Sequence, residues 1–474
     1  MSIMKKRVVG GMGALLLFFC IAVSAQQTQD SVMKFSLEEA KAYALTNSPV
    51  IKNANLDLES AKKKVWETAS IGMPQVNAKA SYSYIITLPD MYASFAGLGS
   101  LGYWMYGVDQ YLGATSGGMW NPTVPQPEGT PKPMDLDKMK WNATLDVTVS
   151  QILFSGAWIV GLQTSKAFKG LSELAITKSE KDIRENVSNA YFLVLVSQEN
   201  KQVIDSTYEN TVKILSQIDA MNKQGLTDET DVDQLQLTVS TIKNAKEMLT
   251  RQVEIATNLL RFQMGLSMTQ PVVLTDNLKA LSAGLESDAL LLKEFQLENQ
   301  VEYKLLATQE RLALMNLKYN KSSVLPDIAA FYQHQEYMNK DAFVLTPPNL
   351  VGVGMNIPIF ASGQRYMKIS QAKIGLMKAQ NTKFQASEGL VMGYNEAKSG
   401  YLTAYNKFNT NKGNLKLSEK IYQRTLTKYQ QGMASSLELT QAQNQYLQNQ
   451  TNYFMSIFEL VSAQNKLAKY VGDN

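Results

Sequence analysis

The residue types that most often carry bond chemistry are scarce in this chain. Its 474 residues include one cysteine, Cys20, and one histidine, His334. A metal cage of cysteine and histidine ligands, or a histidine that activates a nucleophile, needs more of these residues. The sequence also lacks a glycine-rich phosphate-binding motif. We therefore expect no enzyme, no cofactor and no metal site, and the cysteine count also excludes a disulfide scaffold.

The acidic residues with the most suggestive spacing follow a glycine turn. Gly225-Leu226-Thr227 precedes a short acidic run, whose members are Asp228, Glu229, Asp231 and Asp233. A second turn of the same kind, Gly432-Met433-Ala434, precedes Glu438. Glycine permits the left-handed conformation that ends helices, and the helix dipole favours acidic side chains where the next helix starts. Each turn therefore predicts the end of one helix and the start of another, and the dipole accounts best for Asp228 and Glu229.

The N-terminus has the three parts of a secretory signal. Residues 5–7 are basic, residues 8–23 form an apolar core, and Val23-Ser24-Ala25 is a small-residue cleavage site. The apolar run is too short for a membrane anchor. We expect residues 1–25 to be removed on export, which leaves 43 basic and 42 acidic residues. This near-neutral balance does not indicate nucleic-acid binding.

The chain carries an internal repeat. Gly156, Gly225 and Gly265 are each matched by another glycine 207 positions later. Further upstream, the segment 47–74 aligns without gaps on 299–326, at an offset of 252. The two offsets differ because the first copy has a much longer loop after Pro74. Several matches in the same order indicate a duplication.

Proline placement and heptad spacing predict very long helices. Prolines are missing between Pro133 and Pro271 and after Pro358, so nothing in these stretches breaks a helical ladder. Apolar residues from Ile183 to Ile218 follow a heptad spacing, which is typical of helices that supercoil around neighbours. A helix over residues 158–221 would be about 96 Å long at ~1.5 Å per residue. Such a rod does not fit inside one compact domain.

Between the helical stretches, four segments alternate apolar and polar residues with the period of a β-strand. They lie at about 74–88, 140–154, 326–338 and 349–360. Their length suits the roughly 9–11 residues of a tilted membrane strand, and aromatic residues lie near their ends. A sheet packed on a soluble core would alternate in the same way. In lipid, however, so few strands cannot close a barrel, and open edges are not viable. Several identical chains must then share one barrel.

These signals predict a signal peptide at 1–25 and two structural repeats at 26–290 and 291–474. Each repeat opens with a helix and contains two of the strands. The first repeat continues with a long helix pair at 157–265 and an equatorial segment at 266–290, and the second with a long helix pair at 363–472. The predicted fold is mainly α with a small β part, built from long antiparallel coiled-coil helices and two β-hairpins per chain.

This order of elements resembles the TolC family of outer-membrane efflux proteins. The matching phrases are Phe35–Ala40 at the first helix, Gln151–Gly156 after the second strand and Tyr429–Gly432 before the last helix. The resemblance implies a homotrimer in the outer membrane, whose β-barrel continues into a periplasmic α-helical barrel. It implies the exit duct of a tripartite efflux or type I secretion system. Its partners would be outer-membrane lipid, a periplasmic membrane-fusion adaptor and an inner-membrane pump of the resistance-nodulation or ATP-driven kind.

The same resemblance suggests roles for the two glycine turns. In TolC-like proteins such turns form the periplasmic tip that adaptors contact, which here comprises Gly225, Leu226, Thr227, Gly432, Met433 and Ala434. Family members can carry two aspartates at the adjoining pore constriction, and the matching positions here are Glu438 and Gln441. Only one of them is acidic, and the first copy is expected to compensate in part with Asp228, Glu229, Asp231 and Asp233. Copies of Glu438 and Asp231 around a narrow axis would favour cations in the closed pore.

The segment 89–138 is an unusually long loop that would face the exterior. Between Met91 and Pro127 its only charged residue is Asp109, among many aromatic residues. We expect either a lid over the barrel mouth, with Trp104, Tyr106 and Trp120 as its aromatic contacts, or an adherent flap.

Two other functions stay open. A barrel-anchored trimeric coiled-coil protein, structural or adhesive, would share the rods but have no axial conduit. An enzyme would require polar residues that converge in a closed pocket. As cargo of a duct, drugs, metals, proteins and surfactants all stay open, because such ducts take their specificity from the pump and adaptor.

Overall fold

The structure is a computed structural model that describes residues 32–87, 101–128, 140–283, 290–339 and 347–472. The expected signal peptide lies outside the described residues. Within them, no helix has both the length and the apolar content needed to cross a membrane.

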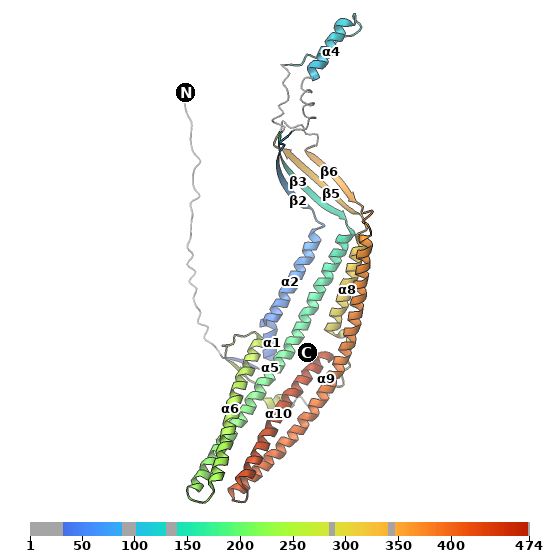
Figure 1. Cartoon of the computed structure of the whole chain (residues 1–474). Helices are drawn as coiled ribbons and strands as arrows, with labels where there is room; N and C mark the ends of the chain where they lie inside the picture. The colour runs from blue at the N-terminus through green and yellow to red at the C-terminus, as the bar shows by residue number, and fades with distance from the viewer. Residues whose placement is uncertain (1–31, 88–100, 129–139, 284–289, 340–346, 473–474) are drawn as a thin grey trace, which may run out of the picture.

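Six long helices form the rods of the molecule (Figure 1), and they occur as three pairs of equal length. The pairs are α2 (Pro49–Ser70) with α8 (Val301–Ser322), α5 (Gly156–Asn222) with α9 (Gln364–Gln430), and α6 (Glu229–Met264) with α10 (Ser436–Val471). Their lengths are 22, 67 and 36 residues respectively. The internal repeat is therefore visible as two copies of the same helical scaffold.

A four-stranded antiparallel sheet joins one end of these rods. Its strands are β2 (Gln75–Tyr84), β3 (Trp141–Phe154), β5 (Asp327–Tyr337) and β6 (Asn349–Asn356), paired in the order β2-β3-β5-β6. The strand β6 has 8 residues and ends before the expected position 360, because Pro358 cannot donate to a strand ladder. The strands β2 and β6 are the two edges of the sheet, so each presents an unpaired row of backbone groups.

The register separates an apolar face from a polar face in the β2–β3 pair, whereas across the β3–β5 pair Leu145 lies opposite Glu336. Val76 lies opposite Val149, and Ala80 lies opposite Leu145, whereas Lys79 lies opposite Asp146. Throughout the β2–β3 pair, apolar residues meet apolar residues and polar residues meet polar ones. All ten residues of β2 are exposed within this single chain.

The main core lies around the middle of α5 and α9, where the C-terminal parts of α6 and α10 pack against them. A short parallel pair, β1 (Met33–Phe35) with β4 (Val272–Leu274), fixes the N-terminal segment there, next to α1 (Leu37–Asn47), α7 (Leu278–Ala283) and the 3₁₀ turn η4 (Leu297–Asn299). The hydroxyl of the fully buried Tyr191 lies 2.9 Å from Asp276 Oδ2 and 3.0 Å from the carbonyl oxygen of Phe35. Asp276 also accepts a 2.7 Å hydrogen bond from the Leu37 amide. This equatorial core is the largest apolar cluster that the described residues form.

A smaller apolar cluster lies near the end of the rods that is farthest from the sheet. It consists of Ile214, Ile218, Leu235, Tyr422 and Leu439. Because it draws on α5, α6, α9 and α10, it joins the first helical hairpin to the second. We call it the tip cluster.

Candidate functional site

Two glycine turns, which we call the tip turns, end the helical rods at the far end from the sheet (Figure 1). Gly225 has φ 69° and Gly432 has φ 70°, both in the left-handed region. The amide of Leu226 donates to the carbonyl of Met221 at 3.0 Å, and the amide of Met433 donates to Lys428 at 2.8 Å. These six-to-one bonds define a Schellman motif in both turns. A side chain at either glycine would meet no other atom, so the requirement for glycine is conformational.

Both tip turns present an apolar side chain outward. Leu226 is 66% exposed and Met433 is 65% exposed. They occupy the same position of the two Schellman motifs. Thr227 and Ala434 are half-buried behind them. The six expected tip residues therefore lie together at one end of the molecule, with two equivalent apolar contacts per chain.

The helix that follows each turn carries an acidic residue at the same position, but the two acids have different partners. Glu438 accepts a 3.0 Å hydrogen bond from the Ser435 amide, and its own amide donates to Ser435 Oγ at 3.2 Å. This reciprocal capping box satisfies two amides at the start of α10. In the first copy, Asp228 occupies the cap position, and among the described residues its side chain makes no capping bond.

Asp231, the equivalent of Glu438 in the first copy, reaches into the other hairpin. It accepts a short hydrogen bond from Ser436 Oγ and another, at 2.9 Å, from Thr227 Oγ1. Ser436 is 3% exposed, and its Oγ also lies 3.0 Å from Gln234 Oε1. We call Asp231, Gln234 and Ser436 the tip link, because these side chains connect α6 to α10. A hydrogen bond to an ionised carboxylate is stronger than one between neutral groups.

Tyr429, in the last turn of α9, lies close to the tip link. Burial raises the pKa of Tyr429 to about 12, and the negative charge of Asp231 adds to this effect. Its hydroxyl group is buried and finds no hydrogen-bond partner among the described residues. The phenol therefore stays uncharged and lies beside the Asp231 carboxylate.

The expected constriction residues fall into two groups. Glu438 and Gln441 are both exposed and lie three residues apart, on one face of α10. Asp231 is half-buried and is engaged in the tip link. Sequence reasoning missed Ser436 and Gln234. The repeat offset of 207 places Asp231 opposite Glu438 and was the available signal for comparing the two helix starts.

The three expected lid residues also separate. Trp104 lies on α4 (Leu101–Thr115) and is 67% exposed, whereas Tyr106 is half-buried on another side of that helix. Trp120 lies on the return segment after α4, and its indole N–H donates to Asp109 Oδ1 at 2.8 Å. Figure 1 shows α4 beyond the sheet, at the end of the molecule opposite the tip turns.

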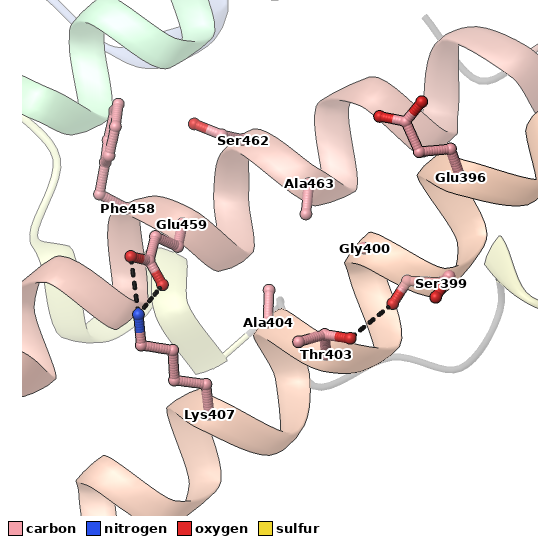
Figure 2. Close-up of a pocket in the computed structure, with 10 residues that line it drawn as sticks. All are labelled: Glu396, Ser399, Gly400, Thr403, Ala404, Lys407, Phe458, Glu459, Ser462 and Ala463. Atoms are coloured by element: carbon pink, nitrogen blue, oxygen red, sulfur yellow. Dashed lines mark hydrogen bonds and ion pairs between the residues drawn. The ribbon is translucent and has the colours of Figure 1, made fainter. Parts of the chain in front are cut away.

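A groove between α9 and α10 is the clearest hollow on the second hairpin (Figure 2). Its volume is about 640 Å³, and small side chains such as Ala404 and Ala463 line it. At one end Lys407 Nζ lies 2.6 Å from Glu459 Oε2. In the groove, Thr403 Oγ1 donates to the Ser399 carbonyl at 2.9 Å. The described residues hold no group of three acidic, histidine or cysteine side chains that could bind a metal ion.

Two of the three comparisons with known proteins found similar proteins. Residues 306–473 match the family described as Outer membrane efflux protein. No curated protein matches the chain. Solved structures share its fold over nearly its whole length, and this confirms the predicted fold class. Together with the family match, they bear out the resemblance to the TolC family.

Three of these structures illustrate the likeness. CusC, described by its conformational changes on folding and transmembrane channel formation, superposes with a TM-score of 0.71 at 14% identity, covering 93% of this chain and 92% of its own. VceC of Vibrio cholerae gives 0.67 at 14% identity, covering 92% and 96%. The CmeC outer membrane channel of Campylobacter jejuni gives 0.69 at 14% identity, covering 92% and 85%.

Proposed function

We propose that this chain, whose residues 306–473 match the outer membrane efflux protein family, forms the outer-membrane exit duct of a tripartite efflux or type I secretion system. The observation that carries the proposal is the open sheet at one end of rods that run on to the tip turns. An isolated sheet of this size cannot enclose water within lipid. Further copies of the chain would supply the missing strands by pairing β6 of one copy with β2 of the next.

The separation of an apolar from a polar face in the β2–β3 pair supports a barrel in lipid. The face that holds Val76, Ala80 and Leu145 would contact hydrocarbon, and the face that holds Lys79 and Asp146 would line a wet interior. The chain itself performs no bond chemistry in this proposal. The energy for transport comes from an inner-membrane pump, through a periplasmic adaptor.

We further propose that the tip turns bind the adaptor and that the exposed face of α10 forms the constriction. Leu226 and Met433 offer the adaptor two apolar contacts per chain. Glu438 and Gln441 would face the pore axis in a closed assembly, where repeated carboxylates attract cations. Asp231 contributes to this site by holding the two hairpins together.

Two substitutions on neighbouring residues of β2 test the membrane barrel. Ala80→Arg places a charge at the middle of the apolar face, where such a change costs about 2–4 kcal/mol in a membrane barrel. Ser81→Arg places the same charge on the polar face and is the matched control. We expect Ala80→Arg to abolish heat-stable oligomers in the outer-membrane fraction and Ser81→Arg to preserve them.

Conductance decides between a duct and a solid coiled coil. The purified oligomer should form ion-conducting channels in planar bilayers. An assembly that inserts into lipid but conducts no ions would favour the structural or adhesive protein. A monomer that stays in solution without detergent would rule out both.

A further inference from the structure

The helix α4 displays an apolar stripe that nothing in the described part of the chain covers. Its members recur at intervals of three and four residues and therefore lie on one face of the helix. They are Leu101, Trp104, Met105, Val108, Tyr111 and Leu112, each between 37% and 68% exposed. This is the heptad pattern with which helices pack against one another.

The return segment 116–128 packs beside the stripe, along the side of α4 that carries Asp109 and Gly113. Asp109, only 4% exposed, accepts 2.8 Å hydrogen bonds from the Trp120 indole and the Val124 amide. The Trp120 amide donates to Ser116 Oγ at 2.9 Å. A side chain at Gly113 would collide with Pro122, 2.4 Å away. The helix and its return segment thus support each other and leave the stripe free.

The charges around the stripe favour a second copy of the same helix as its partner. Asp109 is the only charged residue between Met91 and Pro127, and its carboxylate is buried and bonded to the return segment. Identical helices can therefore approach through this face without repulsion between like charges, which opposes self-association at many helix surfaces. The stripe also offers bulky apolar side chains, of which Trp104 is the largest.

The connection of α4 to the sheet brings its copies together. The helix lies in the chain between β2 and β3, which are hydrogen-bonded neighbours. In a barrel built from several chains, each copy therefore carries its α4 to the same rim. Tethering at a common rim raises the effective concentration of the helices, so that even a short stripe can associate.

We infer that the α4 helices of neighbouring copies pack through this stripe and form a helical cap over the outer mouth of the duct. This inference rests on the shared barrel proposed above. The cap would restrict the entry of large solutes from outside, and outward traffic would have to separate the helices. The partner is another copy of this chain, and Trp104 lies in the contact.

Cysteine cross-linking tests the cap cleanly, since the only cysteine, Cys20, lies in the expected signal peptide. Val108→Cys places a thiol on the stripe, and Gln110→Cys places one on an exposed position of α4 outside it. In intact outer membranes, mild oxidation should convert Val108→Cys to disulfide-linked dimers at least about ten times more than Gln110→Cys, because the bond forms only at close range. Equal cross-linking, or none, would overturn the cap.

A second readout identifies the other possible occupant of the stripe. In vesicles with spin-labelled lipid, the fluorescence of Trp104, obtained as the difference between the wild type and Trp104→Phe, should be quenched no more than in lipid without the label. Strong quenching would show that the stripe lies in the bilayer and would contradict the cap. The Ala80→Arg and Ser81→Arg pair reports on the barrel separately. If that pair behaves as expected while Val108→Cys fails to cross-link, the cap alone is wrong.

Discussion

The two tip turns have the same backbone but use their side chains differently. Both end a 67-residue helix, begin a 36-residue helix and place glycine near φ 70°. In the second turn Glu438 caps its own helix. In the first, Asp231 accepts hydrogen bonds from Ser436 of the other hairpin and from Thr227 of its own turn. The two copies thus share one scaffold, but only one of the two equivalent carboxylates bonds the other hairpin.

The equivalent residues Glu438 and Asp231 therefore have different surroundings. Glu438 stays on an exposed face, where its charge is available to ions. Asp231 is half-buried and acts within the chain. Substitutions at equivalent positions of the two turns can therefore be compared directly.

The largest expected effect is the loss of the tip cluster that the two hairpins share. Leu235 is fully buried on α6 and Leu439 is 1% exposed on α10. Leu235→Ala and Leu439→Ala should each destabilise the tip by about 2–5 kcal/mol through the lost burial and the cavity left behind. Hydrogen–deuterium exchange of tip amides in the intact oligomer measures this loss.

The exposed apolar residues of the same turns provide the controls. Leu226→Ala and Met433→Ala remove side chains of similar size that are mostly exposed. Tip exchange should change by less than about 0.5 kcal/mol, while binding of the adaptor weakens. Equal destabilisation by buried and exposed changes would show that the tip cluster does not hold the hairpins together.

The tip link should produce the next largest effect. A hydrogen bond to a charged group is worth about 1.5–3 kcal/mol. Asp231→Ala and Ser436→Ala should therefore each weaken tip protection in both hairpins, and the double variant should cost less than the sum of the two. A double-mutant cycle on exchange rates measures the coupling. Strictly additive effects would contradict a direct bond between the two residues.

The matching cycle in the second copy sharpens the contrast. Ser435 and Glu438 are partners within one helix start, so their loss should raise exchange near residue 436 and leave the first turn unchanged. A typical cap contributes about 1 kcal/mol. If exchange also rose in the turn at Gly225, Glu438 would not act only within its own helix start, and its distinction from Asp231 would be lost.

How well each contact could be predicted depends on how far apart its residues lie in the sequence. The long helices were predictable because proline is absent and because residues such as Ile183, Val187 and Ile204 keep a heptad spacing, and all three are buried. The Ser435–Glu438 capping box spans four residues, so it depends only on local sequence. The Asp231–Ser436 bond joins residues 205 positions apart. It depends on how two rods align along their length, which local spacing does not determine.

The glycines of the two turns should respond alike. Gly225→Ala and Gly432→Ala force a side chain into the left-handed region at a cost of about 1–2 kcal/mol each. Because both motifs have the same geometry, the two losses should agree within about 0.5 kcal/mol. Asparagine tolerates this conformation better, so Gly225→Asn and Gly432→Asn should recover part of the stability. Thermal unfolding of the oligomer monitors all four variants.

The charge at Glu438 should alter conductance more than stability. Glu438→Gln removes the charge and keeps an amide that can complete the capping box. We expect cation block of single channels to weaken about fivefold, which corresponds to roughly 1 kcal/mol of lost attraction. Glu438→Ala should weaken block equally and also loosen the helix start. Unchanged block in both variants would exclude Glu438 from the constriction.

The smallest effect at neutral pH is expected at Tyr429, whose equivalent in the first copy is Asn222. Asn222 Nδ2 donates to the Thr227 carbonyl at 2.8 Å, so Asn222→Ala should cost about 1 kcal/mol. Tyr429→Phe removes a buried hydroxyl that has no partner among the described residues and should be neutral within about 0.5 kcal/mol.

Alkaline pH should widen the difference in stability between these two variants. The pKa of Tyr429 rises from 10.0 to about 12 in the folded chain, first through burial and then through the Asp231 charge. A raised pKa means that the neutral phenol stabilises the fold below pH 10 and that this contribution is lost as the pH rises toward 12. Tyr429→Phe should therefore make tip protection less sensitive to pH in that window, although Tyr422 and Tyr446, whose pKa values are also raised, keep some dependence. A pH profile identical to that of the wild type would show that the Tyr429 hydroxyl is not held beside the Asp231 carboxylate.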